Sequence, residues 1–107
     1  GKIPLIPSLG YSEQGDLHNI NADYLARAVA ISLGAKKFIL MTDVKGVLEN
    51  GQVLDHLNLV DVHKKIDSGV ITGGMIPKIQ SAVQTVESGV EQVVIGDNLT
   101  DGTIIKE

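Results

Sequence analysis

The sequence predicts an α/β fold in which a mostly parallel sheet lies between two layers of helices, a three-layer sandwich. Two apolar runs without alternation, Phe38–Met41 and Gln92–Ile95, are typical of strands that are buried on both faces of such a sheet. Each run follows a helical pattern, a glycine (Gly34 or Gly89) and a short connection. This is half of a βαβ crossover used twice, and it predicts helices on both faces.

Length and composition limit the classes of protein to consider. The chain has 107 residues, enough for one domain that buries about 60–70% of its unfolded surface. Its formal net charge is -4 and no Lys/Arg cluster is interleaved with aromatic residues, so we expect neither nucleic acid nor an anionic membrane as partner. No apolar run approaches the roughly 20 residues of a membrane span. The absence of cysteine excludes disulfides and thiolate metal sites, and fits a cytoplasmic protein.

The first third of the chain predicts an edge strand, a loop and a helix. The apolar run Ile3–Pro7 contains prolines, which lack an amide donor and so restrict it to a sheet edge. Ser8–Asp16 is predicted to be a loop with a tight turn around Gly15. Asn21 is the expected N-cap of a helix that ends at Gly34. The apolar face of that helix consists of Leu25, Ala26, Val29 and Leu33.

The middle and the end of the chain predict a hairpin, a short helix and a last strand. The pair Asn50-Gly51 lies between two short apolar pairs, which is typical of a hairpin turn. Apolar residues at helical spacing between Leu59 and Ile66 predict a helix closed by Gly69. Gly102–Ile105 is predicted to be the final strand.

The segment Gly69–Lys78 reads as a glycine-bearing loop that enters a helix. Pro77 is tolerated only in the first turn of a helix, so the helix should begin close to Gly74. Lys78 then lies near the positive end of the helix dipole, an unfavourable place unless an anion is bound there. The segment therefore suggests a phosphate site. A Gly-Gly turn beside a solvated lysine explains the same residues equally well.

Other candidate residues each have a structural alternative. Asp23 lies near a helix start and favours the dipole there, and Asp43 follows the strand 38–41, at the sheet edge where open α/β folds bind ligands. Neither standard glycine-rich phosphate-binding motif is present. The three histidines are scattered without a ligand spacing, so no protein metal site is predicted. No constellation for nucleophilic catalysis occurs either.

Three separated segments resemble a known family. Asn19–Asp23, Thr42–Leu48 and Gly69–Lys78 are similar, in this order, to the carboxyl-terminal half of the N-acetylglutamate kinase family within the amino acid kinase superfamily. The resemblance covers nearly the whole chain. It implies transfer of the γ-phosphoryl group of ATP, with Mg²⁺, to the side-chain carboxylate of N-acetyl-L-glutamate in arginine biosynthesis. It also implies a cytoplasmic homo-oligomer.

The resemblance assigns roles residue by residue. Lys78 matches the lysine that stabilises the transferring phosphoryl group, Asp23 the aspartate that orients the catalytic lysines, and Asn19 the asparagine that contacts the amino-acid substrate. Phosphoryl transfer needs positioning and charge compensation, which suits these residue types. The segments that match the surroundings of the nucleotide are Asp43, Val44, Lys45, Gly46, Val47 and Leu48, with Val70, Ile71 and Thr72.

The chain also departs from the family. Its members have an amino-terminal half that supplies a second catalytic lysine, glycine loops and most of the substrate pocket, and residues 1–107 contain none of it. We therefore expect residues 1–107 to be the nucleotide-binding half and to be inactive alone. In addition, a short polar link precedes the final strand, where the family commonly has a longer connection with a helix. The alternatives are a non-catalytic nucleotide-binding or sensing module, and a kinase for a related substrate such as N-acetyl-aminoadipate.

Overall fold

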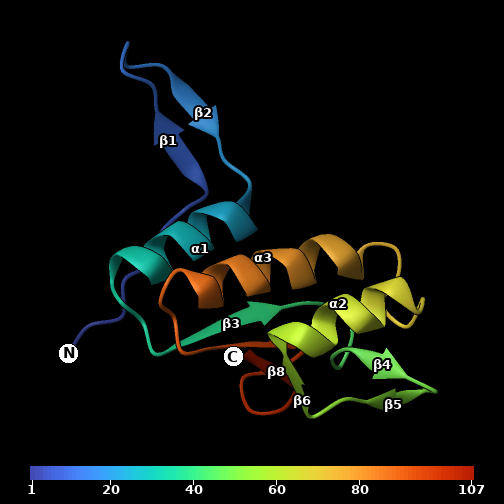
Figure 1. Cartoon of the computed structure of the whole chain (residues 1–107). Helices are drawn as coiled ribbons and strands as arrows, with labels where there is room; N and C mark the ends of the chain where they lie inside the picture. The colour runs from blue at the N-terminus through green and yellow to red at the C-terminus, as the bar shows by residue number, and fades with distance from the viewer.

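The computed structural model describes all 107 residues, and its centre is a four-stranded sheet (Figure 1). The strand order is β3 (Lys37–Met41), β7 (Gln92–Gly96), β8 (Thr103–Lys106) and β6 (His56–Asn58). β3 pairs with β7 and β6 with β8 in parallel, whereas β7 and β8 are antiparallel. The sheet is therefore mixed. The strands predicted at 38–41, 92–95 and 102–105 are confirmed, and β6, which the apolar pattern did not predict, completes the sheet.

Three helices occupy the predicted stretches: α1 (Ala22–Ser32), α2 (Leu59–Asp67) and α3 (Met75–Glu87). The side chain of Asn21 caps α1, because its Oδ1 accepts a hydrogen bond of 3.1 Å from the Tyr24 amide. Gly74 is the N-cap of α3, so Pro77 lies in the first turn as predicted. None of the three helices combines the length and the apolarity that crossing a bilayer requires.

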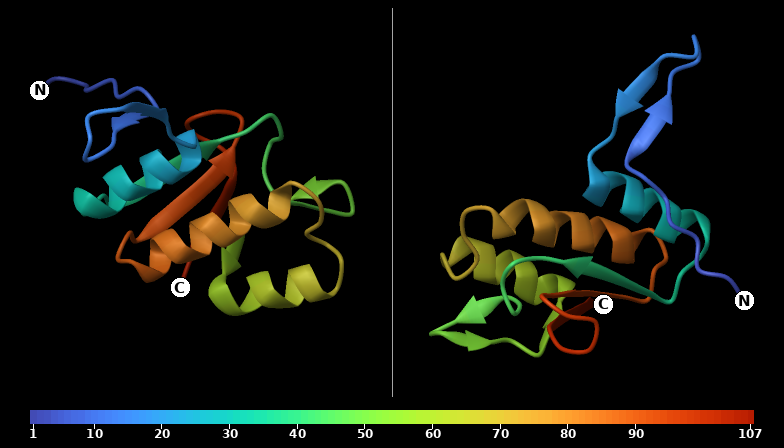
Figure 2. Two further views of the ribbon diagram at one scale, coloured as in Figure 1. Left: turned by 90° about the horizontal axis from the view of Figure 1, so that it is seen from above. Right: turned by 180° about the vertical axis from the view of Figure 1, so that it is seen from behind.

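All three helices pack on one face of the sheet, as the views from above and behind show (Figure 2). The hydrophobic core lies between the helices and alternate strand residues such as Leu40, Val93 and Ile105. The predicted helices on both faces are wrong for these 107 residues. The reason lies after β7, where the short segment Asp97–Gly102 turns back over the second face instead of forming a helix. This segment lines one cavity together with Val94, whose side chain is buried although no helix lies on that face.

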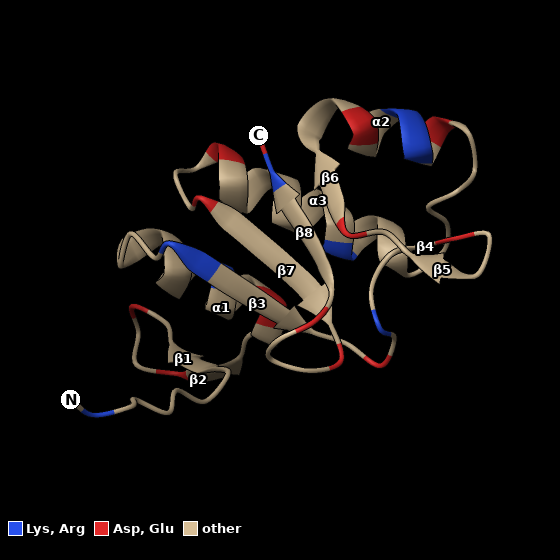
Figure 3. Cartoon of the chain, turned by 90° about the horizontal axis from the view of Figure 1, so that it is seen from below, with Lys and Arg blue, Asp and Glu red and all other residues tan.

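Seen from below, the uncovered face of the sheet carries few charges along its strands, and the acidic residues gather in the connecting loops (Figure 3). β3 forms one edge of this sheet. Ile39, Val94 and Ile104 stand in register across the uncovered face. These apolar side chains account for the strand pattern that predicted burial on both faces.

The hairpin of β1 (Leu9–Tyr11) and β2 (Leu17–Asn19) projects from the body beside the start of α1 (Figure 1). The expected edge strand at residues 3–7 is wrong, because these residues have no regular secondary structure and the ladder begins after Pro7. The predicted loop 8–16 is partly wrong, since Leu9–Tyr11 is a strand. The turn around Gly15, whose φ is 87°, is confirmed.

A second hairpin, β4 (Leu48–Glu49) and β5 (Gln52–Val53), confirms the prediction from Asn50-Gly51. Asn50 and Gly51 have φ values of 52° and 78°, the left-handed conformation that a two-residue hairpin turn requires. This hairpin lies at the opposite end of the body from the first one (Figure 1).

Candidate functional site

The fold brings Lys78 and Asp23 together although they lie 55 residues apart. The ammonium Nζ of Lys78 donates to Oδ2 of Asp23 at 3.2 Å. Asp23 lies in the first turn of α1 and Lys78 in the first turn of α3. Because α1 and α3 lie side by side, with their first turns at the same end, the two predicted catalytic residues meet at one corner of the molecule (Figure 2).

The ion pair at this corner is open to solvent. The Lys78 side chain is 27% exposed and that of Asp23 is 46% exposed. An ion pair in such a position contributes only about 0–1 kcal/mol to folding, because water screens it and two flexible side chains must be ordered. Stability alone therefore gives little reason for the pair, and the ammonium remains accessible to a ligand.

The start of α3 adds positive potential beside Lys78. No side chain caps this helix, and its first turn contains no acidic residue. The amides of Met75 and Ile76 donate to the carbonyls of Thr72 and Gly73 over 3.3 and 3.2 Å, and Pro77 has no amide hydrogen. The helix dipole and the lysine charge thus point to the same place, where an anion is electrostatically favoured.

A shallow hollow of about 310 Å³ surrounds the pair. Its lining comes from the first two turns of α1 and α3 and their N-caps: Asn21, Asp23, Tyr24, Arg27, Gly74, Pro77, Lys78 and Ser81. The sequence prediction missed Arg27, the second cation of this hollow. The i, i+4 spacing of Asp23 and Arg27 on the predicted helix was the available signal, because it places both side chains on one face.

Asn19, the predicted substrate contact, lies at the end of β2 and is exposed. It pairs across the hairpin with Leu9 and precedes α1 by three residues. It does not line the hollow around Lys78. The structure therefore brings Asn19 to the same end of α1 as Asp23 without joining it to the ion pair.

The predicted nucleotide loop Asp43–Leu48 follows the carboxyl end of β3. Asp43, Lys45 and Leu48 are exposed, Val44 is half-buried, and Gly46 and Val47 are buried. The Val47 amide donates to Thr103 Oγ1 at 2.9 Å, and the same hydroxyl donates to the Leu54 carbonyl at 2.6 Å. Val47 thus packs in the core, and a ligand could contact only the exposed side chains and the backbone of this loop.

Gly46 allows the close approach of this loop to β8. A Cβ at Gly46 would lie 2.8 Å from both Thr103 Oγ1 and Val53 Cγ1. Such distances are too short for a real side chain, so any larger residue would push the loop away from Thr103. The glycine in the matched segment therefore has a packing role.

The second predicted nucleotide segment, Val70–Thr72, leads into α3. The Val70 and Ile71 amides both donate to the Lys65 carbonyl, at 2.9 and 3.1 Å, which closes the end of α2. Ile71 is buried in the core and Val70 is half-buried, whereas Thr72 is exposed. Of these three, only Thr72 presents its side chain fully to solvent.

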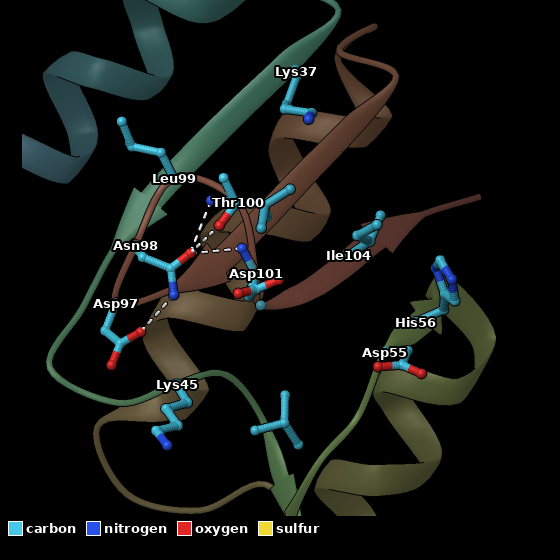
Figure 4. Close-up of a pocket in the computed structure, with 13 residues that line it drawn as sticks. Lys37, Lys45, Asp55, His56, Asp97, Asn98, Leu99, Thr100, Asp101 and Ile104 are labelled. Atoms are coloured by element: carbon cyan, nitrogen blue, oxygen red, sulfur yellow. Dashed lines mark hydrogen bonds between the residues drawn. The ribbon is translucent and has the colours of Figure 1, made fainter.

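A larger cavity, of about 670 Å³, lies elsewhere, over the face of the sheet that carries no helix (Figure 4). Among the predicted site residues only Lys45 lines it. The loop on one side of it is ordered by Asn98, whose Oδ1 accepts from the amides of Thr100 and Asp101 at 2.8 and 2.6 Å. The cavity shares no residue with the hollow around Lys78 and Asp23. No motif in the sequence pointed to it.

Comparisons with known proteins agree with the three matched segments. Acetylglutamate kinase from Streptococcus mutans serotype c is 64% identical over 104 residues, which are 97% of this chain and 42% of that protein. The crystal structure of smu.665 from Streptococcus mutans UA159 superposes with a TM-score of 0.81 at 65% identity, over 92% of this chain and 40% of that one. N-acetylglutamate synthase from Neisseria gonorrhoeae, complexed with coenzyme A and L-arginine, gives a TM-score of 0.79 at 26% identity, over 94% and 27% of the two chains.

The chain thus spans less than half the length of these relatives. A sequence profile supplies the assignment at family level: the profile of the Amino acid kinase family matches residues 1–97 of 107. With this match and the fold it shares with these proteins, the chain belongs to the amino acid kinase family.

Proposed function

We propose that residues 1–107 form the nucleotide-binding half of an acetylglutamate kinase, which transfers the γ-phosphoryl group of ATP to the side-chain carboxylate of N-acetyl-L-glutamate. The observation that carries this proposal is the contact of Lys78 with Asp23 at the uncapped start of α3. Phosphoryl transfer requires positive charge beside a reacting anion rather than a covalent nucleophile. This corner offers that charge in a position open to solvent.

In this proposal each residue has one role. Lys78 donates to the transferring phosphoryl group, and Asp23 orients the Lys78 ammonium. Asn19 contacts the acylamino acid. A carboxylate acceptor is already ionised at neutral pH, so no general base is needed. The nucleotide lies along the loop Asp43–Leu48 and the segment Val70–Thr72, at the carboxyl end of β3.

Several further features belong to the proposal. Mg²⁺ is expected to be held mainly through the ATP phosphates and water, since no three histidine or acidic side chains of this chain are grouped as ligands. The remaining length of the longer relatives would supply the second catalytic lysine and the rest of the substrate pocket. It would also supply the second layer of the three-layer sandwich. We propose a cytoplasmic homo-oligomer for the complete enzyme.

The main alternative is a nucleotide-binding or sensing module without turnover. The Neisseria protein is a reason to keep this alternative, because it is an N-acetylglutamate synthase with a similar fold. A module that only binds nucleotide has a use for Lys78 but little use for Asp23 beside it. The ion pair therefore supports the kinase over the module. A kinase for N-acetyl-aminoadipate uses the same groups and differs only in the acceptor pocket.

Binding of ADP to the 107-residue chain tests the nucleotide site. Amide chemical shifts should change at Asp43–Leu48, Val70–Thr72 and the start of α3 when ADP is added. Adenosine, which lacks phosphates, is the matched control and should leave the start of α3 unchanged. Changes confined to the amino ends of β3 and β7 would contradict the proposed site.

A chimera tests the reaction. In it, residues 1–107 replace the matching region of the Streptococcus mutans acetylglutamate kinase. We expect the chimera to form acetylglutamyl phosphate from ATP and N-acetyl-L-glutamate, and to prefer this acceptor over N-acetyl-aminoadipate. We expect the 107-residue chain alone to show no detectable turnover, because orienting two reactants is worth about 7–11 kcal/mol and one of them would have almost no pocket. Robust turnover by the isolated chain would refute that expectation.

A further inference from the structure

We propose that Arg27 is a positioning residue: its bond to Gln84 fixes α1 against α3, so that Asp23 meets Lys78. Arg27 Nη1 donates to Gln84 Oε1 at 2.5 Å, across 57 residues of sequence. The contact is the second polar link between α1 and α3, beside that of Asp23 with Lys78. The catalytic meaning of this inference rests on the proposed function, but the positioning itself does not.

Helix geometry places both links on the same seam. Asp23 and Arg27 are four residues apart on α1, so their side chains share one face. Lys78, Ser81 and Gln84 follow one another at intervals of three on α3 and form one row along that helix. Apolar core contacts hold α1 and α3 together, and two polar links along one seam further restrain the rotation and the sliding of one helix against the other.

The aromatic ring of Tyr24 restrains Arg27 further. The guanidinium carbon lies 5.0 Å from the centroid of this ring, within the range of a cation–π contact. A planar guanidinium held over a ring and bonded to an amide oxygen has few remaining rotamers. Arg27 is half-buried, so part of its stem is also covered. Its head group is therefore more ordered than an exposed arginine on a helix.

Gln84 also affects which cation, Arg27 or Lys78, forms the ion pair with Asp23. An arginine four residues after an aspartate on a helix is placed to pair with it. Here Arg27 donates to Gln84 instead, and the ion pair of Asp23 is with Lys78. Loss of Gln84 would release Arg27 toward Asp23 and leave Lys78 without its partner. The bond thus keeps Arg27 away from Asp23, whose exposed ion pair with Lys78 is weak by itself.

The test uses NMR of the 107-residue chain with ¹³C-labelled lysine. It measures how far the Lys78 chemical shifts change when the charge of Asp23 is removed, and we call this change the Asp23–Lys78 coupling. Asp23→Asn should shift the Lys78 Cε and Hε resonances in the otherwise unchanged chain. In an Arg27→Met background, Asp23→Asn should cause less than half of that shift. In a Gln84→Leu background the reduction should be at least as large. The exchanged pair Arg27→Gln with Gln84→Arg restores a bond between the same positions and should restore most of the shift.

Gln80→Leu is the matched control, because Gln80 is an exposed glutamine of α3 that makes no side-chain hydrogen bond. It should leave the coupling unchanged. If Arg27→Met prevents folding, Arg27→Lys serves in its place, since it keeps the charge and loses the planar fork. An undiminished Lys78 response in folded Arg27→Met or Arg27→Lys would overturn the inference, as would an equal loss in Gln80→Leu.

Kinetic measurements on the chimera separate this inference from the proposed function. In the chimera, Arg27→Met should lower kcat about tenfold to a hundredfold with little change in the KM for ATP, because a displaced catalytic group loses reaction geometry. The exchanged pair should recover most of kcat. An inactive chimera whose NMR coupling responds as expected would refute the kinase and leave the positioning role supported. A kcat unaffected by Arg27→Met would refute the positioning role in catalysis.

Discussion

The loop Asp43–Leu48 and the corner formed by Lys78 and Asp23 belong to the same proposed site, yet they are held in different ways. The loop is fixed by a buried hydroxyl, Thr103 Oγ1, which bonds a backbone amide on one side and a backbone carbonyl on the other. The corner is held by side chains alone, in an ion pair that solvent reaches. One region depends on buried neutral hydrogen bonds and the other on exposed charge.

This difference separates stability from function. Removing one partner of a buried hydrogen bond leaves a polar group without water, which costs folding energy directly. Removing one partner of an exposed ion pair costs little, because water replaces it. The same charge is worth much more in a transition state, where it faces a developing charge that water no longer screens. Substitutions in the loop should therefore reduce stability, and substitutions in the corner should reduce turnover.

The largest effect is expected at Lys78. In the chimera, Lys78→Met should lower kcat by roughly 10²–10³-fold or more, with little effect on the affinity for ATP, since the ammonium acts mainly where charge develops. Steady-state kinetics with ATP and N-acetyl-L-glutamate measure both quantities. Lys64→Met, at an exposed lysine of α2, is the control and should behave as the unchanged chimera. A kcat within a few-fold of the unchanged chimera in Lys78→Met would remove Lys78 from the reaction.

Asp23→Asn sharpens the comparison, because it should separate the two kinds of effect in one variant. We expect kcat to fall by a similar order as in Lys78→Met, through misplacement of the lysine, while the free energy of unfolding changes by less than about 1 kcal/mol. Urea unfolding of the 107-residue chain gives the second value. A loss of stability of several kcal/mol with normal turnover would reverse the roles assigned to the two regions.

Thr103→Val tests the loop. Valine has the shape of threonine without the hydroxyl, so the Val47 amide and the Leu54 carbonyl lose their partner. We expect a loss of about 2–3 kcal/mol in the free energy of unfolding, from two unsatisfied backbone groups. Thr103→Ser keeps the hydroxyl and removes one methyl group, and should cost about 1 kcal/mol. Equal losses in the two variants would mean that packing, rather than the hydroxyl, holds the loop.

The elements of the fold were largely predictable from local signals. Asn21, Pro77 and Asn50-Gly51 act within a few residues of themselves, and the structure places a helix start, a first turn and a hairpin where each predicted them. The layer arrangement was not predictable in the same way. The apolar runs predicted a helix on each face of the strands, but an apolar run does not specify what lies against the second face, where these residues have the loop Asp97–Gly102 and a cavity instead of a helix.

The same limit applies to the site. The spacing around Pro77 placed Lys78 at a helix start, but only the family resemblance connected it with Asp23, because contacts across 55 residues leave no local pattern. Arg27 and Gln84 matched no motif and were missed for that reason. Val47 and Ile71 lie in matched segments, and the structure gives both a buried position. A matched segment therefore contains residues that shape the loop as well as residues that face solvent.

The smallest effect is expected at the other ion pair of the molecule, which resembles the corner in its geometry and differs from it in its surroundings. Lys65 Nζ donates to Glu49 Oε2 at 2.7 Å, with side chains 28% and 30% exposed. This bond joins the hairpin of β4 and β5 to α2, away from Lys78 and Asp23. It lies beside Leu48 and Val70 of the proposed nucleotide segments but away from the reacting phosphoryl group, so it should contribute a little to stability and nothing to kcat.

Glu49→Gln should lower the free energy of unfolding by less than about 1 kcal/mol, and the difference should shrink in 1 M NaCl, where charges are screened beyond about 3 Å. Glu13→Gln, at an exposed glutamate of the turn between β1 and β2 that forms no ion pair, is the control and should show a smaller change. In the chimera neither variant should alter kcat, whereas Asp23→Asn should. If Glu49→Gln lowered kcat as strongly as Asp23→Asn, the distinction between the two ion pairs would fail. Any ion pair that joins two elements of this fold would then affect turnover, and the pair of Lys78 and Asp23 would have no specific role in the reaction.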